Sequence, residues 1–179
     1  AFVGWNGTYS FNASGRRIPL EGVKAMAYPQ APLTGLLEFN ADGTGTFDVP
    51  RYQFRGRIRD LFVADEGVGE VTGRLDVRGN SMTIEVEAAS PRLAVSGTGR
   101  IDLTETQDTD VTLRFTDTSL DPYARAFEKR FSPFTTAVGS GTLRVIGELA
   151  NPDRLIVDVL FDQLQIRTFD YLLRNSKPI

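Results

Sequence analysis

The side chains that could do chemistry limit what this 179-residue chain could catalyse. It has no histidine and no cysteine, and its 20 Lys and Arg residues nearly balance its 23 Asp and Glu residues. Histidine-dependent triads, histidine-ligated zinc sites, thiolate nucleophiles and iron–sulfur clusters are therefore excluded. Asp108 and Asp110 are a close carboxylate pair, but they lack the spacing of a calcium-binding loop, so we expect a turn there. The composition favours a binding or structural module over an enzyme, without metal or cofactor.

Two sets of side chains are candidates for recognition. The first is a run of alternate arginines, Arg51, Arg55, Arg57 and Arg59, which could meet phosphate headgroups or a partner. A solvated outer strand face is the simpler interpretation of such a run. The second is an aromatic group near the N-terminus, Trp5, Tyr9 and Phe11, which is similar to sugar-binding platforms but which we expect to pack in the core. The net charge of −3 gives no reason to expect nucleic acid as a partner.

Apolar and polar residues alternate along most of the chain, which is the period of a β-strand. Turn signals at residues 40–43, 79–80 and 151–153 separate the alternating runs. The pattern predicts an antiparallel sheet with one dry face and one wet face. The dry face is expected to line either a lipid groove or a closed core with twelve residues: Leu75, Val77, Ile84, Val86, Leu93, Val95, Leu113, Phe115, Leu143, Val145, Val157 and Val159.

One segment, residues 121–131, breaks the strand period and predicts a short helix. Asp121 suits the N-cap and Pro122 suits the first helical position. Tyr123, Phe127 and Phe131 are spaced four residues apart, so a helix would carry their rings on one stripe. We expect this stripe either to cover the groove or to cap one end of the sheet.

Glycine positions indicate an internal repeat. A Gly-x-apolar-x-apolar pattern begins at Gly7, Gly35, Gly45, Gly73, Gly99 and Gly141. Once the helical segment is set aside, the pattern recurs about every 26 to 28 residues, which is typical of stacked, quasi-one-dimensional architectures. An ordinary sandwich with glycines at bends is the alternative.

The last third of the chain resembles a known family. It contains SLDPY at residues 119–123, GSGTLRVIGEL at 139–149, Asn-Pro at 151–152, LQI at 164–166, and DYxLRNxxPI at 170–179. In this order the segments resemble the repeated cassette of the TamB and AsmA-like superfamily. That cassette has a glycine-rich strand, Gly-x-Leu, an Asn-Pro turn, a further strand and Asn-x-x-Pro-Ile. The resemblance covers about residues 110–179.

The resemblance implies a fold, a location and a function. Its members are large periplasmic proteins of Gram-negative bacteria, anchored to the inner membrane, whose long U-folded sheet (a β-taco) presents an apolar concave face. That face is thought to conduct phospholipid acyl chains between the inner and outer membranes and so to support outer-membrane biogenesis. Some members work with an outer-membrane assembly barrel, which other parts of the full-length chain would contact.

We therefore expect a mainly β fold, a curved antiparallel sheet folded into a U-shaped trough of about 10 to 12 strands with one short helix near 121–131. Residues 1–179 would be a single β-rich segment inside a much longer repetitive protein. Its expected function is non-enzymatic binding or conduction of phospholipid acyl chains. The alternative is a β-sandwich recognition module that binds glycan or protein, which would need two packed sheets.

Overall fold

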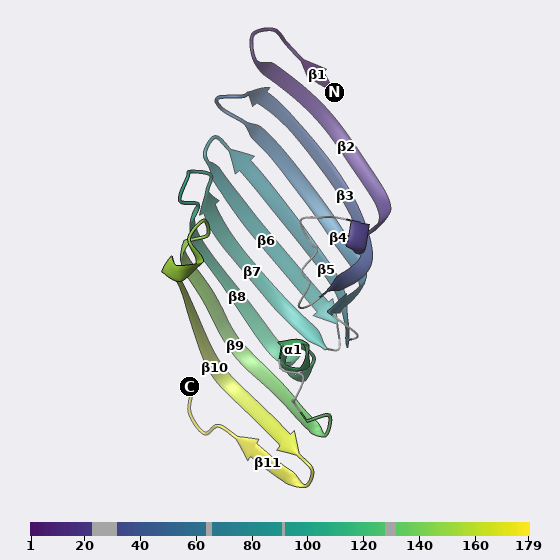
Figure 1. Ribbon diagram of the computed structural model, residues 1–179, viewed down its shortest axis with the longest axis vertical. Helices are drawn as coiled ribbons and strands as arrows, with labels where there is room; N and C mark the ends of the chain where they lie inside the picture. The colour runs from purple at the N-terminus through teal and green to yellow at the C-terminus, as the bar shows by residue number, and fades with distance from the viewer. Residues whose placement is uncertain (23–31, 64–65, 91, 128–131) are drawn as a thin grey trace.

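A single antiparallel sheet of eleven strands makes up most of the fold (Figure 1). The computed structural model describes residues 1–22, 32–63, 66–90, 92–127 and 132–179. Each strand pairs with its neighbours in sequence, so the two chain ends lie at opposite ends of the sheet (Figure 1). The predicted mainly β fold, with 10 to 12 antiparallel strands and one short helix, is confirmed.

The strands and helices follow one another in a simple up-and-down order. The first half holds β1 (Phe2–Val3), β2 (Thr8–Pro19), the 3-10 turn η1 (Leu20–Gly22), β3 (Leu33–Thr46), β4 (Arg51–Val63), β5 (Glu66–Arg78) and β6 (Ser81–Ser90). The second half holds β7 (Leu93–Asp102), β8 (Asp108–Ser119), α1 (Asp121–Phe127), β9 (Thr135–Glu148), η3 (Pro152–Arg154), β10 (Leu155–Thr168) and β11 (Tyr171–Arg174).

The strand registers bring the apolar residues of successive strands onto one face. Residues directly opposite each other in an antiparallel pair share a face, and side chains alternate along each strand. Leu75 of β5 lies opposite Ile84 of β6, and Leu113 of β8 lies opposite Leu143 of β9. The same face continues through Val159 of β10. One face of the sheet is therefore apolar from end to end.

Bulges bend four alternate strands of the sheet. Register shifts occur in β2 between Gly15 and Ile18, in β4 after Ile58, in β8 between Phe115 and Thr118, and in β10 between Phe161 and Gln163. Three of these bulges contain a non-glycine residue with positive φ: Arg17, Asp60 and Asp117. A bulge bends its strand and increases the local twist, so the repeated bulges account for the strong curvature.

The position of α1 shows that the apolar face is the concave one. Leu120, just before α1, lies over Gly139 together with the ring of Phe161, and both Gly139 and Phe161 belong to the apolar face. The helix contacts β9 and also β4, which lies five strands away. In a flat sheet these two strands would be about 24 Å apart. The sheet must therefore curl toward the helix, which lies in front of it in Figure 1.

The sheet is a single layer with a large exposed surface. The chain has an accessible surface of 12121 Å² at a mass of 19.7 kDa. A compact monomer of this mass would expose roughly 8,600 Å². Among the described residues only five apolar side chains are buried: Leu20, Val77, Ala88, Phe115 and Ala137. The architecture is one open sheet, where a sandwich would need two.

Candidate functional site

The candidate site is the concave face of the sheet, here called the apolar trough and lined by the twelve residues predicted from the sequence. The registers of β5 to β10 place all twelve on this face. One continuous row runs from Val86 through Gly97 and Leu113 to Leu143 and Val159, crossing five strands. The structure thus brings together residues that are up to 84 positions apart in the chain, from Leu75 to Val159.

The trough residues are only partly covered. Val77 and Phe115 are buried, whereas Val157 and Val159 on β10 are 56% and 43% exposed. The other eight are half-buried: Leu75, Ile84, Val86, Leu93, Val95, Leu113, Leu143 and Val145. No second sheet lies over them in the described residues. Soluble proteins rarely leave so long an apolar face open unless it binds something.

Glycines on the same face give the trough its depth. A Cβ at Gly99 would lie 2.5 Å from a methyl group of Val111, and one at Gly43 would lie 2.5 Å from the ring of Phe11. Large side chains therefore lie directly over the glycine backbone of the next strand. Because glycine alternates with large residues, the side chains on this face occupy less volume than they would if every position carried a large side chain. That difference favours a sheet that curls toward the apolar side.

The apolar trough extends beyond the predicted residues into the N-terminal strands. The register places Phe11 of β2, Phe39 of β3 and Phe54 of β4 on the same face. The rings of Phe39 and Phe54 stack with their centroids 5.4 Å apart. The sequence carried the signal for Phe54, since Tyr52, Phe54 and Ile58 alternate with arginines, but none of these residues was among the predicted lining residues.

α1 closes one end of the trough through a buried carboxylate. Asp121, which is 6% exposed, accepts hydrogen bonds from Arg125 Nη2 at 2.7 Å and from the backbone N–H of Ala137 at 3.5 Å. Arg92 lies 3.8 Å from the same carboxylate. The predicted helix is therefore present over Asp121–Phe127, and it is tied to β9 at its first residue.

The sequence predicts that Tyr123, Phe127 and Phe131 cover the groove, and of these three only Tyr123 has a described side chain. It is half-buried, and its hydroxyl has no hydrogen-bond partner among the described residues. Burial raises the pKa of Tyr123, against a smaller lowering by nearby Arg92. Phe131 and the side chain of Phe127 lie outside the described residues. The helix lies across the concave face only at this end, so it covers part of the trough.

Asp121→Ala is expected to lower the free energy of unfolding by about 2 to 4 kcal/mol, because it removes the buried carboxylate that two guanidinium groups and a backbone N–H share. Urea denaturation measures this loss, and amide exchange should show α1 opening before the sheet. Asp121→Asn keeps an acceptor oxygen and should lose less. A stability of Asp121→Ala equal to that of the parent chain would show that the carboxylate does not anchor α1.

The outer face of the sheet, opposite the apolar trough, carries the charged residues. Asp110 of β8 accepts two hydrogen bonds from Arg144 of β9, at 3.0 and 2.8 Å. This hydrogen-bonded guanidinium lowers the pKa of Asp110. The prediction that Asp108 and Asp110 form a turn was wrong: both belong to β8. A cross-strand arginine holds Asp110 in the ladder despite the weak strand propensity of aspartate.

Arg144→Gln is expected to raise the pKa of Asp110 back toward its ordinary range. Because pairing lowers the folded-state pKa, the stabilisation is present at neutral pH and disappears as the pH falls through that lowered pKa. Carboxyl ¹³C NMR titration measures the shift. Arg154→Gln is the matched control, since Arg154 lowers the pKa of Glu148 in the same way and should leave Asp110 unchanged. An unchanged Asp110 titration in Arg144→Gln would contradict this assignment.

The aromatic residues near the N-terminus are only partly in the core. Tyr9 is half-buried and its ring stacks on Phe11 and Phe47, with centroids 6.1 and 5.7 Å apart. Trp5 lies in the turn before β2 and is fully exposed, so the expectation of core packing was wrong for it. Its position outside the strand takes it off the face that Tyr9 and Phe11 share.

Apolar side chains also appear on the outer face near the C-terminal edge. Ile156 lies opposite Ile146, and both alternate with trough residues, as does Leu160. Ile156 and Leu160 are well exposed. These outer-face residues were not predicted, although the nearly unbroken apolar run from Leu155 to Phe161 was a signal for them.

The described part of the chain shows neither a cluster of His, Cys, Asp and Glu suited to a metal ion nor a helix long and apolar enough to cross a bilayer. The geometry offers an apolar surface for binding. Comparisons with protein-family models, with curated proteins and with solved structures find no match to this chain.

Proposed function

We propose that the apolar trough binds phospholipid acyl chains and lets them move along it, as a non-enzymatic segment of a TamB- or AsmA-like protein of the bacterial envelope. The observation that carries the proposal is the unbroken, half-exposed apolar face from β2 to β10. The sequence resemblance of residues 110–179 supports the envelope context. The proposal includes a periplasmic location, a membrane-anchored full-length chain and cooperation with an outer-membrane assembly barrel.

Acyl chains suit the trough because they need burial but no hydrogen-bond geometry. Each methylene removed from water contributes about 0.8 kcal/mol, so even partial shielding holds a chain. Small-molecule pockets instead combine apolar walls with a few convergent polar groups. The trough is lined by aliphatic and aromatic side chains and by glycine backbone. A surface of this kind favours weak binding of many lipids over selection of one.

The dimensions of the sheet also suit a chain-like ligand. Eleven strands spaced about 4.8 Å apart give a trough about 50 Å across the strands. The alternative, a sandwich that recognises glycan or protein, has less support, because the described residues form one sheet and Trp5 stands apart from the other aromatic rings.

Site-specific photocrosslinking tests the proposal in the protein's own cells. A photoreactive amino acid at Val95 or Leu143, on the trough, is expected to capture phospholipid. The same group at the adjacent outer positions Ser96 and Thr142 is the matched control, because these residues lie on the same strands and face the other way. Equal lipid capture from both faces, or none from the trough, would contradict the proposal.

A further inference from the structure

The outer face of β4 and β5 contains two pairs of arginines that lie directly opposite each other. Arg55 is the cross-strand partner of Arg74, and Arg51 is the cross-strand partner of Arg78. Directly opposed like charges destabilise a sheet, because their Cβ atoms are only about 5 Å apart. Two such pairs on one hairpin therefore need compensation from nearby negative charge.

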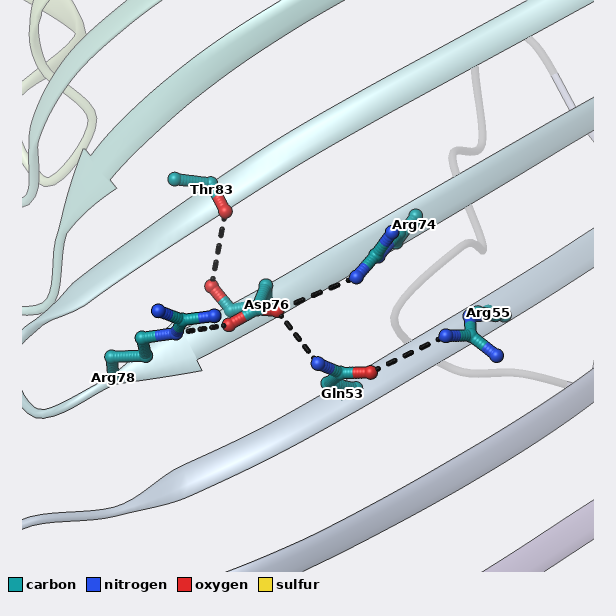
Figure 2. A network of polar contacts seen from close by, with 6 residues as sticks. All are labelled: Gln53, Arg55, Arg74, Asp76, Arg78 and Thr83. Atoms are coloured by element: carbon teal, nitrogen blue, oxygen red, sulfur yellow. Dashed lines mark hydrogen bonds and ion pairs between the residues drawn. The ribbon is translucent and has the colours of Figure 1, made fainter.

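One carboxylate, Asp76, contacts members of both pairs, Arg74 and Arg78 (Figure 2). Asp76 accepts a hydrogen bond from Arg78 Nε at 3.0 Å and lies 3.7 Å from Arg74 Nη2. It also accepts a hydrogen bond from Gln53 Nε2 at 2.9 Å. Gln53 in turn accepts a hydrogen bond from Arg55 Nη2 at 3.4 Å, so the contact shown for Arg55 is to a neutral amide. Among the described residues, Asp76 is thus the only carboxylate in ion-pair contact with these four arginines, although Asp42 and Glu85 carry further negative charge nearby.

Other outer-face arginines that form ion pairs are better balanced. Arg57 and Arg59, the next residues of the run on β4, have Glu70 and Glu38 within ion-pair distance. On β9, Arg144 forms a one-to-one ion pair with Asp110. The cluster of Arg51, Arg55, Arg74 and Arg78, here called the arginine quartet, has fewer direct ion pairs per arginine than these neighbours.

A hollow of about 830 Å³ lies beside the Arg55 and Arg74 pair on this face. Asn40, Thr72 and Thr98 also line it and offer neutral hydrogen-bonding groups. Glu85 lines the hollow from β6, opposite Arg74 in the register, and would repel an anion on that side. Glu38 of β3 and Glu87 of β6 line it further along the strands, so the most favourable place for a negative group is directly between Arg55 and Arg74.

We propose that Arg55 and Arg74 bind a phosphate group, either free phosphate or the phosphate of a lipid headgroup. Guanidinium groups match phosphate oxygens geometrically and form charge-assisted hydrogen bonds with them. A bound phosphate would supply the negative charge that the arginine quartet lacks. The phosphate site lies on the face opposite the apolar trough and uses none of the trough residues. A test of phosphate binding therefore does not depend on whether the trough binds acyl chains.

NMR titration of the full chain tests the site, with the arginine Nε–Hε signals as the readout. Inorganic phosphate and glycerophosphoglycerol are added separately at constant ionic strength, and their relative affinities distinguish free phosphate from a lipid headgroup. We expect the signals of Arg55 and Arg74 to shift and that of Arg144 to stay in place. Shifts of equal size at all three arginines would mean unspecific screening and would overturn the proposal.

Variants check that the two arginines act directly. Arg55→Gln is expected to weaken phosphate binding about tenfold, since it removes a charged donor from a two-arginine site. Glu85→Gln is expected to strengthen binding, because it removes the neighbouring negative charge. Arg144→Gln is the control and should bind phosphate like the parent chain. Unchanged affinity in Arg55→Gln, with the sheet intact by amide spectra, would overturn the proposal.

Discussion

Val159→Asp is expected to weaken acyl-chain binding to the apolar trough at least tenfold while the sheet stays folded. Val159 lies on the trough opposite Leu143 and is 43% exposed, so the folded protein tolerates a charge there. A bound chain would have to cover the carboxylate or lift away from it, and losing two buried methylenes alone removes about 1.6 kcal/mol. Titration with a fluorescent fatty acyl phospholipid measures the affinity.

The neighbouring residue provides a matched control for this prediction. Leu160 is adjacent to Val159 on β10 and equally exposed, but it points to the outer face. Leu160→Asp should therefore bind the acyl probe like the parent chain. If both variants lose binding, the loss comes from the charge on β10 in general. If neither does, the trough is not where the chain binds.

Gly141→Ala is expected to destabilise the fold by about 3 kcal/mol or more. A Cβ at this position of β9 would overlap the backbone carbonyl oxygen of Leu160 on the adjacent strand and would lie 3.0 Å from the ring of Phe115. Overpacking of this kind costs typically 1 to 3 kcal/mol, and a backbone atom cannot move aside as a flexible side chain does. Urea or thermal denaturation measures the change.

Gly73→Ala is the control, because its new Cβ would meet only one neighbouring atom within 4 Å, the carbonyl oxygen of Glu85 at 3.7 Å. Both glycines lie on the apolar face, so the pair separates local crowding from a general effect of methyl groups on the trough. We expect Gly73→Ala to stay within about 1 kcal/mol of the parent chain. Equal effects of the two substitutions would contradict the crowding explanation.

The strand content of the chain, and the side of the sheet on which each side chain lies, could be predicted because both depend on local alternation of apolar and polar residues. Leu143 and Val145, or Val157 and Val159, are each separated by one polar or outward residue, and this spacing alone assigns them to one side of a strand. The start of α1 was an equally local signal, in Asp121 and Pro122. The N-cap assignment was wrong, because Asp121 is the first helical residue and its carboxylate binds Arg125 and Ala137. The order of the strands followed because short turns join antiparallel neighbours.

The features that depend on neighbouring strands could not be predicted. Residues 40–43 have the composition of a turn, yet they lie inside β3, where Gly43 fits under the ring of Phe11 from β2 and beside Tyr52 from β4. Tertiary packing therefore outweighs the turn propensity of Asn, Asp and Gly. The Asp110–Arg144 pair likewise joins residues 34 positions apart, which no local spacing indicates.

The curvature that makes the trough concave was also invisible in local patterns. It depends on the bulges at Arg17, Asp60 and Asp117, all non-glycine residues with positive φ. Arginine carries no signal for that conformation, and aspartate, although enriched in it, occurs at many other positions of this chain, so the pairing on both sides decides where it occurs. The arginine quartet was missed for the same reason, because Arg74 and Arg78 join Arg51 and Arg55 only through the register of β4 and β5.

The most direct test of acyl-chain binding compares the two faces of single strands in one experiment. A phospholipid with a spin label on its acyl chain broadens the NMR signals of nearby methyl groups. We predict broadening of Val145 and Val159, on the trough, with little effect on their outward neighbours Ile146 and Leu160. Equal broadening on both faces, or broadening of the outer methyl groups alone, would contradict a trough that binds acyl chains.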